Sequence, residues 1–353
     1  MMHTIYIRTL KRAEHTVFCV ANGQKFYYDP QFGVRVPYSS GQQVKRSILD
    51  TLAGELNESP APTTFLFDVT KKKEIGEGEV FGTCDPSHFD QLIGGWMKAQ
   101  KGGKEKTIKR RSPLSISAMR ALHPLLAGIE TENITFDRSD RQTNKVIVRG
   151  PDNNILSKEE VLSLIKDKDR SLVRKWIPDN ARATGFFVQD IAVDLRRLFC
   201  VTLNEYEPEI TQETQESLKA QGWIESKNVF GKCLVAPAKY RQKLIPAIAK
   251  SIVDWRITSN QSRTFSLMET LAISISEDAN KIAGSIRGKL NPENERKAIP
   301  VIEENMDGVD TFVSLAAGNY LITNSESAEA MENAKKFISD KIQAFDCENQ
   351  MPA

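Results

Sequence analysis

Several patterns that would identify an enzyme or a metal protein are missing from this chain of 353 residues. The nearest two of its five cysteines, Cys200 and Cys233, are 33 positions apart, so none forms the close pair typical of a structural zinc site. The four histidines have no acidic or cysteine partner at a recognisable catalytic spacing, and no G-x-S-x-G motif is present. We therefore expect no catalytic residues, no metal site and no cofactor.

The chain also lacks an excess of one charge and any long apolar run. Lys plus Arg number 48 and Asp plus Glu 46, a net charge of +2, which by itself favours neither a nucleic acid nor a membrane as partner. No 18 apolar residues run together, which excludes a membrane-spanning helix. The cysteine count is odd, and charged residues occupy the first 19 positions where a signal peptide needs an apolar core. We expect reduced thiols and a cytoplasmic location.

Hydrophobic periodicity predicts a strand, a helix and a strand near the amino end. Residues 4–10 alternate as a strand does, 16–20 are rich in β-formers, and 26–30 form an aromatic-rich turn. A helix follows from residue 41 to about 56 and then a strand at 64–69. A doubly wound sheet would need a G-x-G-x-x-G or G-x-x-x-x-G-K turn, and neither occurs. The pattern favours an α+β fold with a ferredoxin-like core.

The start of the predicted helix combines a cap with basic residues. Ser40 and Gln43 fit a capping box that begins the helix near Gly41. Lys45 and Arg46 in the opening turns oppose the helix dipole, at a cost of a few tenths of a kcal/mol, unless an external anion such as phosphate binds there. Neutral donors at the same end are Ser39, Ser40, Gln42 and Gln43. An ordinary exposed polar face explains the same pattern equally well.

Two further segments are candidates for phosphate binding. The run from residue 98 to 111 carries seven basic residues and one acid, and it is either a solvated loop or an arm along a phosphate backbone. The second segment either binds phosphates or holds a turn before a strand at 265–275. It consists of Asn260, Gln261 and Arg263, with Arg256 upstream.

The rest of the chain predicts alternating strands and helices. We expect a half-buried strand at 114–118, a hairpin over 134–148 and a helical insertion over 153–176. In that insertion Ser157 and Glu160 form a capping box, and its buried face comprises Val161, Leu164 and Ile165. A strand at 186–195 places Asp190 and Asp194 on its polar face, where solvation explains them better than a metal does. A helix follows at 238–252, and the carboxyl-terminal helix at 325–349 carries six acids against three lysines.

The order of these motifs resembles that of the RNA-backbone subunit of CRISPR Cascade-type complexes, the Cas-seven group of the RAMP superfamily. The segment VPYSSGQQVKRSI at residues 36–48 is similar to the start of the first helix in that family. Supporting segments are RSPL at 111–114, GFFVQD at 185–190 leading into VDL at 193–195, and SNQSR at 259–263.

The resemblance implies a single elaborated, modified RRM-like domain over residues 1–353, shaped like a hand with inserted fingers and a thumb. Its parts would be a basic loop or insertion at 71–111, a helical insertion at 151–182 and an acidic helix at 325–349; the thumb would be 153–182 or 71–82. The residues that it implies in RNA binding are Ser39, Ser40, Gln42, Gln43, Lys45, Arg46, Lys109, Arg110, Arg111, Arg256, Asn260, Gln261 and Arg263.

The implied partners are a CRISPR guide RNA, foreign target DNA, other Cascade subunits and further copies of the chain in a head-to-tail filament, without a membrane. Base pairing would read the target sequence while the protein holds the guide. The alternative is an RNA-targeting backbone subunit with metal-dependent ribonuclease activity. Asp29 lies in a loop before the first helix, yet its neighbours Pro30 and Gln31 do not reproduce the motif of such relatives. A scaffold that binds only protein is a third possibility.

Overall fold

The central sheet is built around the first strand of the chain. The computed structural model describes residues 3–18, 24–99, 106–137, 143–257 and 266–351. β1 (Thr4–Thr16) pairs antiparallel with β11 (Arg174–Asp194) on one side and with β15 (Glu269–Ser276) on the other. β8 (Leu114–Ile116) pairs with β11 in turn. The helices α1 (Gly41–Leu56) and α6 (Ala238–Asp254) follow β1 and β11 in sequence and pack together.

The order β1, α1, β8, β11, α6, β15 is the βαββαβ connectivity of a ferredoxin-like unit. Apolar side chains of both helices and of the sheet share one core, with Ile7 of β1, Val44 of α1 and Ile248 of α6 all buried in it. The expected α+β class is confirmed, and α1 has the predicted bounds.

The second face of the sheet is also covered. Leu10 points away from the helices and packs with Leu271 and Val313 in a separate apolar cluster. An RRM stacks bases on this helix-free face, so its burial here removes that platform. The covering and edge elements are α7 (Ala279–Ser285), β16 (Ile286–Asn291), β17 (Asn294–Ile302), β18 (Val309–Ser314), the 3-10 helix η2 (Leu315–Asn319) and β19 (Glu326–Ser327).

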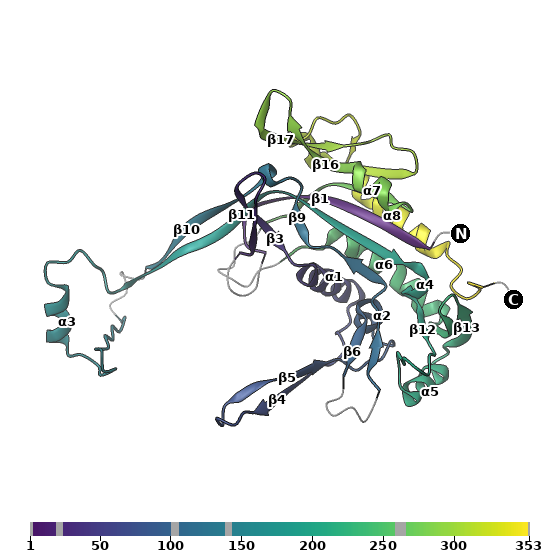
Figure 1. Cartoon of the computed structure of the whole chain (residues 1–353), viewed down its shortest axis with the longest axis horizontal. Helices are drawn as coiled ribbons and strands as arrows, with labels where there is room; N and C mark the ends of the chain where they lie inside the picture. Colours follow the sequence, from purple (N-terminus) through teal and green to yellow (C-terminus); the bar gives the residue numbers. More distant parts are fainter. Residues whose placement is uncertain (1–2, 19–23, 100–105, 138–142, 258–265, 352–353) are drawn as a thin grey trace.

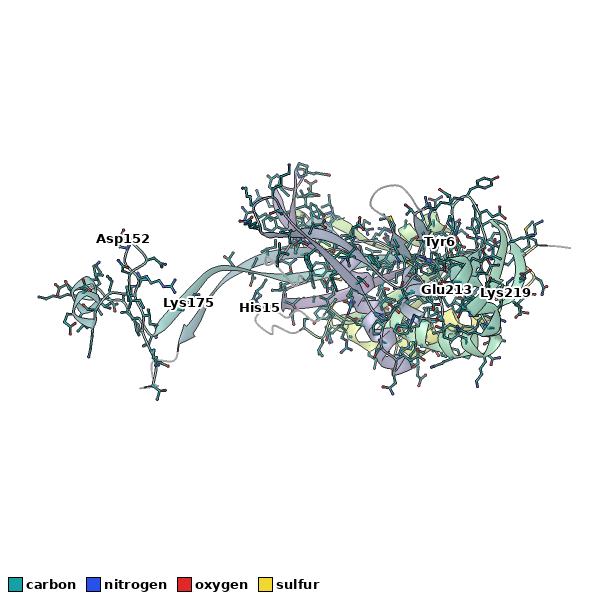
Figure 2. All side chains as sticks on the ribbon, turned by 90° about the horizontal axis from the view of Figure 1, so that it is seen from below. Tyr6, His15, Asp152, Lys175, Glu213 and Lys219 are labelled. Atoms are coloured by element: carbon teal, nitrogen blue, oxygen red, sulfur yellow. The ribbon has the colours of Figure 1, made fainter. Side chains whose placement is uncertain are left out.

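A long two-stranded arm projects from the body. β10 (Ala127–Asp137) pairs with the first half of β11, from Ala127 opposite Gly185 to Asp137 opposite Arg174. Figure 1 shows the arm extending to one side, and Figure 2, after a quarter turn, shows it still clear of the body, with Lys175 along it and Asp152 at its end. The expected hairpin over 134–148 is therefore wrong, because β10 takes its partner from beyond the insertion.

The end of the arm carries α3 (Lys158–Ile165), which is shorter than the predicted helix. The capping box is confirmed, since Ser157 Oγ accepts from the Glu160 amide and the Glu160 carboxylate accepts from the Ser157 amide. The expected buried face is wrong: α3 has no buried residue, and Leu164 is exposed. None of the described residues 143–175 at the end of the arm is buried, so the apolar side of α3 has no core to pack on there.

Two smaller hairpins project below α1 in Figure 1. β4 (Thr64–Val69) has the predicted bounds, but it pairs with β5 (Ile75–Phe81) and all six of its residues are exposed. The last strand of the predicted strand–helix–strand pattern is therefore not part of the core sheet. The short helix α2 (Phe89–Gly94) leads to a second hairpin of β6 (Trp96–Lys98) and β7 (Ile108–Arg110), which form the ends of the predicted basic loop.

The remaining elements edge the sheet or form a lobe at its other end. At the edge are β2 (Phe26–Asp29), β3 (Val34–Ser39), β9 (Met119–Ala121) and the 3-10 helix η1 (Pro124–Leu126). The lobe comprises α4 (Leu195–Leu198), β12 (Cys200–Thr202), α5 (Gln212–Ala220), β13 (Ile224–Asn228) and β14 (Gly231–Val235). The last helix, α8 (Ala330–Gln343), packs on α6 and β18. Among the described residues, no helix has the length and apolar character needed to cross a membrane.

Candidate nucleic-acid interface

The amino end of α1 has the geometry of an anion-binding helix start. β3 ends at Ser39, and Ser40 caps the helix by accepting a hydrogen bond from the Gln43 amide at 3.3 Å. The first turn carries no acid, so no carboxylate neutralises the positive end of the helix dipole. Gln42 is exposed at this end and Gln43 is half-buried. The predicted cap and its neutral donors therefore lie together at one helix terminus.

The close approach of this terminus to the sheet depends on a glycine. A β-carbon at Gly41 would lie 2.8 Å from the Ile116 carbonyl oxygen and 3.1 Å from that of Ser117. Ser39 beside it is fully buried, and its hydroxyl has no hydrogen-bond partner among the described residues. Ser39 therefore lies behind the surface that Ser40 and Gln42 form.

The two basic residues of the first turns differ in their surroundings. Lys45 Nζ donates to the Gly94 carbonyl oxygen at 2.5 Å, at the carboxyl end of α2, where a cation is favoured by the helix dipole. Burial, together with the nearby Arg110 charge, lowers the pKa of Lys45 to about 8. Arg46 is exposed and pairs with Asp50, one turn along the same helix, at 2.9 Å. Arg46 is thus the cation that α1 presents to solvent.

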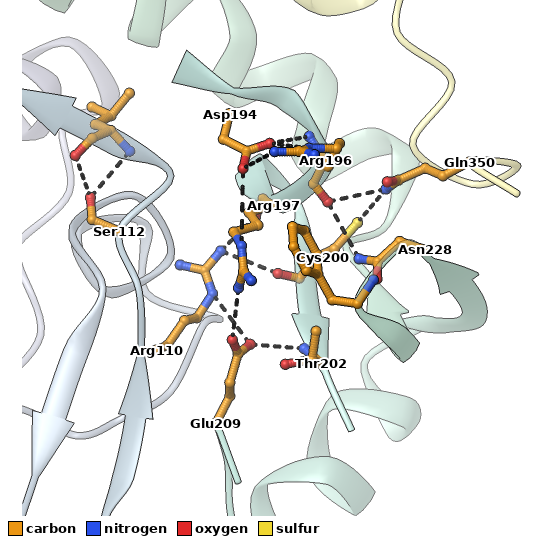
Figure 3. Close-up of polar contacts among 12 residues, drawn as sticks. Arg110, Ser112, Asp194, Arg196, Arg197, Cys200, Thr202, Glu209, Asn228 and Gln350 are labelled. Carbon is orange, nitrogen blue, oxygen red and sulfur yellow. Dashed lines mark hydrogen bonds and ion pairs between the residues drawn. The ribbon is translucent and has the colours of Figure 1, made fainter. Parts of the chain in front are cut away.

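The predicted basic loop contains one arginine with an internal structural position. Arg110 is only 3% exposed, and its guanidinium donates to the carbonyl oxygens of Leu92, Arg197 and Cys200. It also lies 3.9 Å from the Glu209 carboxylate (Figure 3). The same guanidinium lies over the Trp96 ring. Burial lowers the pKa of Arg110 to about 10, partly offset by the Glu209 charge.

These contacts correct the expectation that Arg110 binds RNA, because its donors are occupied inside the protein. Its neighbours do lie at the surface. Arg111 is exposed, and Lys109 is half exposed with an ion pair to Glu207 at 2.9 Å.

Only one residue of the predicted turn near position 260 is described. Arg256 is exposed directly after α6, whereas Asn260, Gln261 and Arg263 lie outside the described residues. The preceding Trp255 is fully buried, and Lys11 of β1 lies over its ring at 4.7 Å. Lys11 Nζ also donates to Thr270 Oγ1 at 2.8 Å, and burial lowers its pKa to about 7.

An ion-pair network replaces the solvated carboxylate expected at Asp190. Arg8 of β1 binds its carboxylate at 2.6 Å and Arg120 of β9 binds it at 3.0 Å. Burial alone would raise the pKa of Asp190, but the two arginines outweigh it and lower that pKa. Arg8 and Arg120 are far apart in sequence, so only the pairing of β1, β11 and β9 reveals this network.

Asp29, the candidate catalytic residue of the ribonuclease alternative, has a local structural role. Asp29 Oδ1 accepts from the amides of Gln31 and Phe32, at 3.1 and 3.0 Å, and so holds the turn between β2 and β3. Throughout the described ranges there is no cluster of three or more His, Cys, Asp or Glu side chains arranged to hold a metal ion.

Comparisons with known proteins find solved structures with a similar fold but no relative by sequence. No family model matches the sequence, and no curated protein matches it. A chain of a solved structure described as a CRISPR RNA-guided surveillance complex, pre-nicking, is similar over 96% of this chain and 88% of its own length, at 9% identity and a TM-score of 0.41. A chain of another structure, described as a CRISPR RNA-guided surveillance complex, is similar over 96% of this chain and 99% of its own, at 11% identity and a TM-score of 0.43.

Proposed function

We propose that this protein is a non-catalytic, guide-RNA-binding backbone subunit of a Cascade-like CRISPR surveillance complex. The observation that carries the proposal is the start of α1, where the segment on which the family resemblance rests forms a strand end, a serine cap and a helix with no acid in its first turn. Such a terminus binds a phosphate through its free amides. Ser40, Gln42 and Arg46 would supply the side-chain contacts to the guide backbone.

The arm supports the same proposal. The resemblance implies a thumb made of a hairpin that reaches out of an RRM-like palm, and β10 with β11 is a long antiparallel pair leaving a ferredoxin-like sheet. The thumb would therefore be the β10–β11 arm with the insertion at its end, rather than the passage 71–82, which contains β5.

Self-association would use the end of the arm. Val161 and Ile165 of α3 are only half-buried, and the neighbouring Leu162 and Leu164 are each 53% exposed. An apolar helix face that stays exposed to solvent is typical of a contact with another protein surface. In a head-to-tail filament this face would pack on the next copy, and the guide would then lie along the row of α1 termini for pairing with target DNA.

The experiment replaces one exposed basic residue at the α1 start and one elsewhere, and compares the salt dependence of RNA affinity in the two variants. Arg46→Gln removes the exposed cation at the α1 start. Lys336→Gln is the control, because Lys336 is also exposed and pairs with Asp340 four residues on in α8. Fluorescence anisotropy with CRISPR RNA over a salt series should give a slope of log affinity against log salt that is shallower by about 0.7 for Arg46→Gln alone.

Equal slopes for wild type and Arg46→Gln would contradict the assignment of this terminus. Incubation of the assembled complex with matched RNA and magnesium tests the ribonuclease alternative, since regular cuts in the RNA would support it.

A further inference from the structure

The β2–β3 hairpin exposes three consecutive aromatic side chains that the contacts above do not involve. Phe26 is 45% exposed, Tyr27 41% and Tyr28 63%. Aromatic rings are the side chains that gain most from leaving water, so a group of them at the surface indicates a binding surface.

The strand register puts two of these rings on one face with a cation between them. Phe26 lies opposite Pro37 and Tyr28 opposite Arg35, and since side chains alternate along a strand, all four share a face. The Arg35 guanidinium lies 5.1 Å from the centre of the Phe26 ring. Tyr27 points the other way and meets the Tyr38 ring at 6.1 Å.

The hairpin is held in place by local contacts, so its rings are presented on a fixed backbone. Asp29 accepts two amide hydrogen bonds in the turn, and Gly33 adopts the left-handed conformation (φ 65°) that closes it. The Phe32 ring packs edge-on against His123, at 4.9 Å, and Val36 is fully buried.

Its place in the fold links it to the proposed RNA path. β3 runs directly from Arg35 to the Ser40 cap, five residues or about 17 Å at the rise of a strand. β3 also contacts β10 at the base of the arm (Figure 1). The hairpin therefore lies close to the amino end of α1 along β3, and β3 packs beside β10 at the base of the arm.

We propose that Phe26 and Tyr28 stack on bases of single-stranded RNA while Arg35 binds the phosphate between them; this rests on the function proposed above. Interleaved rings and cations are the pattern of sequence-independent single-strand binding. Strand alternation puts Arg35 on this face and Asp29 on the opposite one, and Lys25 beside the hairpin is exposed, so the local charge is net cationic. This favours a polyanion over a protein as the occupant.

The test compares a strand with bases and a strand without them. The full-length Phe26→Ala/Tyr28→Ala variant should bind polyuridine at least about tenfold more weakly than wild type. On an abasic oligonucleotide of the same length it should bind as wild type does. Arg35→Gln should weaken binding to both strands and reduce the salt slope by about 0.7. Tyr206→Ala is the control, an 89% exposed ring flanked by Glu205 and Glu207.

Each outcome separates the two proposals. Unchanged polyuridine affinity in the double variant overturns the stacking proposal, and so does an equal loss on both strands, which would show a structural effect. The Phe26→Tyr/Tyr28→Phe variant keeps both aromatic rings, so it should bind polyuridine as tightly as wild type does. Weaker binding by this variant would also count against stacking. Loss of complex assembly with unchanged polyuridine affinity would assign the face to a protein partner instead. If wild type binds neither strand, the proposed function itself fails.

Discussion

Arg110 provides a prediction in which stability and RNA binding separate. Replacing it by methionine removes a guanidinium that donates to three backbone carbonyl oxygens and pairs with the buried Glu209. Methionine keeps most of the side-chain volume, so the loss is mainly electrostatic. The Glu209 carboxylate keeps its pairing with Arg197 at 3.3 Å, so the cost comes from the three lost hydrogen bonds. Hydrogen bonds to a charged group contribute about 1.5–3 kcal/mol each, so the total loss is at least about 3 kcal/mol. We expect a loss of this size in the free energy of unfolding.

Urea unfolding followed by tryptophan fluorescence measures this loss, because the Trp96 ring lies 5.4 Å from the Arg110 guanidinium and reports the same region. Arg111→Met is the matched control. Arg111 is the next residue and is exposed, so its replacement should change stability by less than about 0.5 kcal/mol. If Arg110→Met unfolds within about 1 kcal/mol of wild type yet loses RNA affinity, Arg110 is a nucleic-acid contact and the structural account of it is refuted.

Two further predictions concern the α1 terminus and the buried lysine. Gly41→Ala forces the helix start away from the Ile116 and Ser117 carbonyls, so it should lower both the thermal midpoint and the RNA affinity. Gly54→Ala is the control, because Gly54 faces open space on the same helix, and it should lower neither. A Gly41→Ala variant with the thermal midpoint and RNA affinity of wild type would contradict the close packing. Lys11 has a folded-state pKa of about 7, below its ordinary 10.5, so the unfolded chain binds more protons between these values and the Lys11 contribution to stability rises with pH across that window. Urea midpoints of wild type and Lys11→Met from pH 6 to 10 should therefore differ by an amount that changes with pH, and a constant difference would show that Lys11 titrates normally.

Features set by neighbouring residues could be predicted from the sequence. The bounds of α1, its Ser40 cap and the capping box before α3 depend on residues within one turn of each other, and all are present. The bounds of β4 were also predictable, because strand formers alternate there regardless of what they face.

Features set by distant partners could not be predicted in this way. β10 pairs with a segment on the far side of the insertion, and periodicity does not identify a partner strand. Arg110 belongs to a basic run that is typical of a solvated loop. It is buried nevertheless, and carbonyl oxygens of α2 and α4 accept hydrogen bonds from its guanidinium. The aromatic run at 26–28 was visible as a turn, but the register with β3 is needed to place Arg35 beside Phe26.

The most direct test of the central claim is whether the protein carries RNA. The full chain is expressed together with a CRISPR array and purified at moderate salt, and the ratio of absorbance at 260 to 280 nm is measured. A guide-binding backbone subunit should elute as an oligomer with a nucleic-acid ratio that ribonuclease treatment lowers. A ratio typical of protein alone, in a preparation whose assembly state does not depend on RNA, would contradict the account.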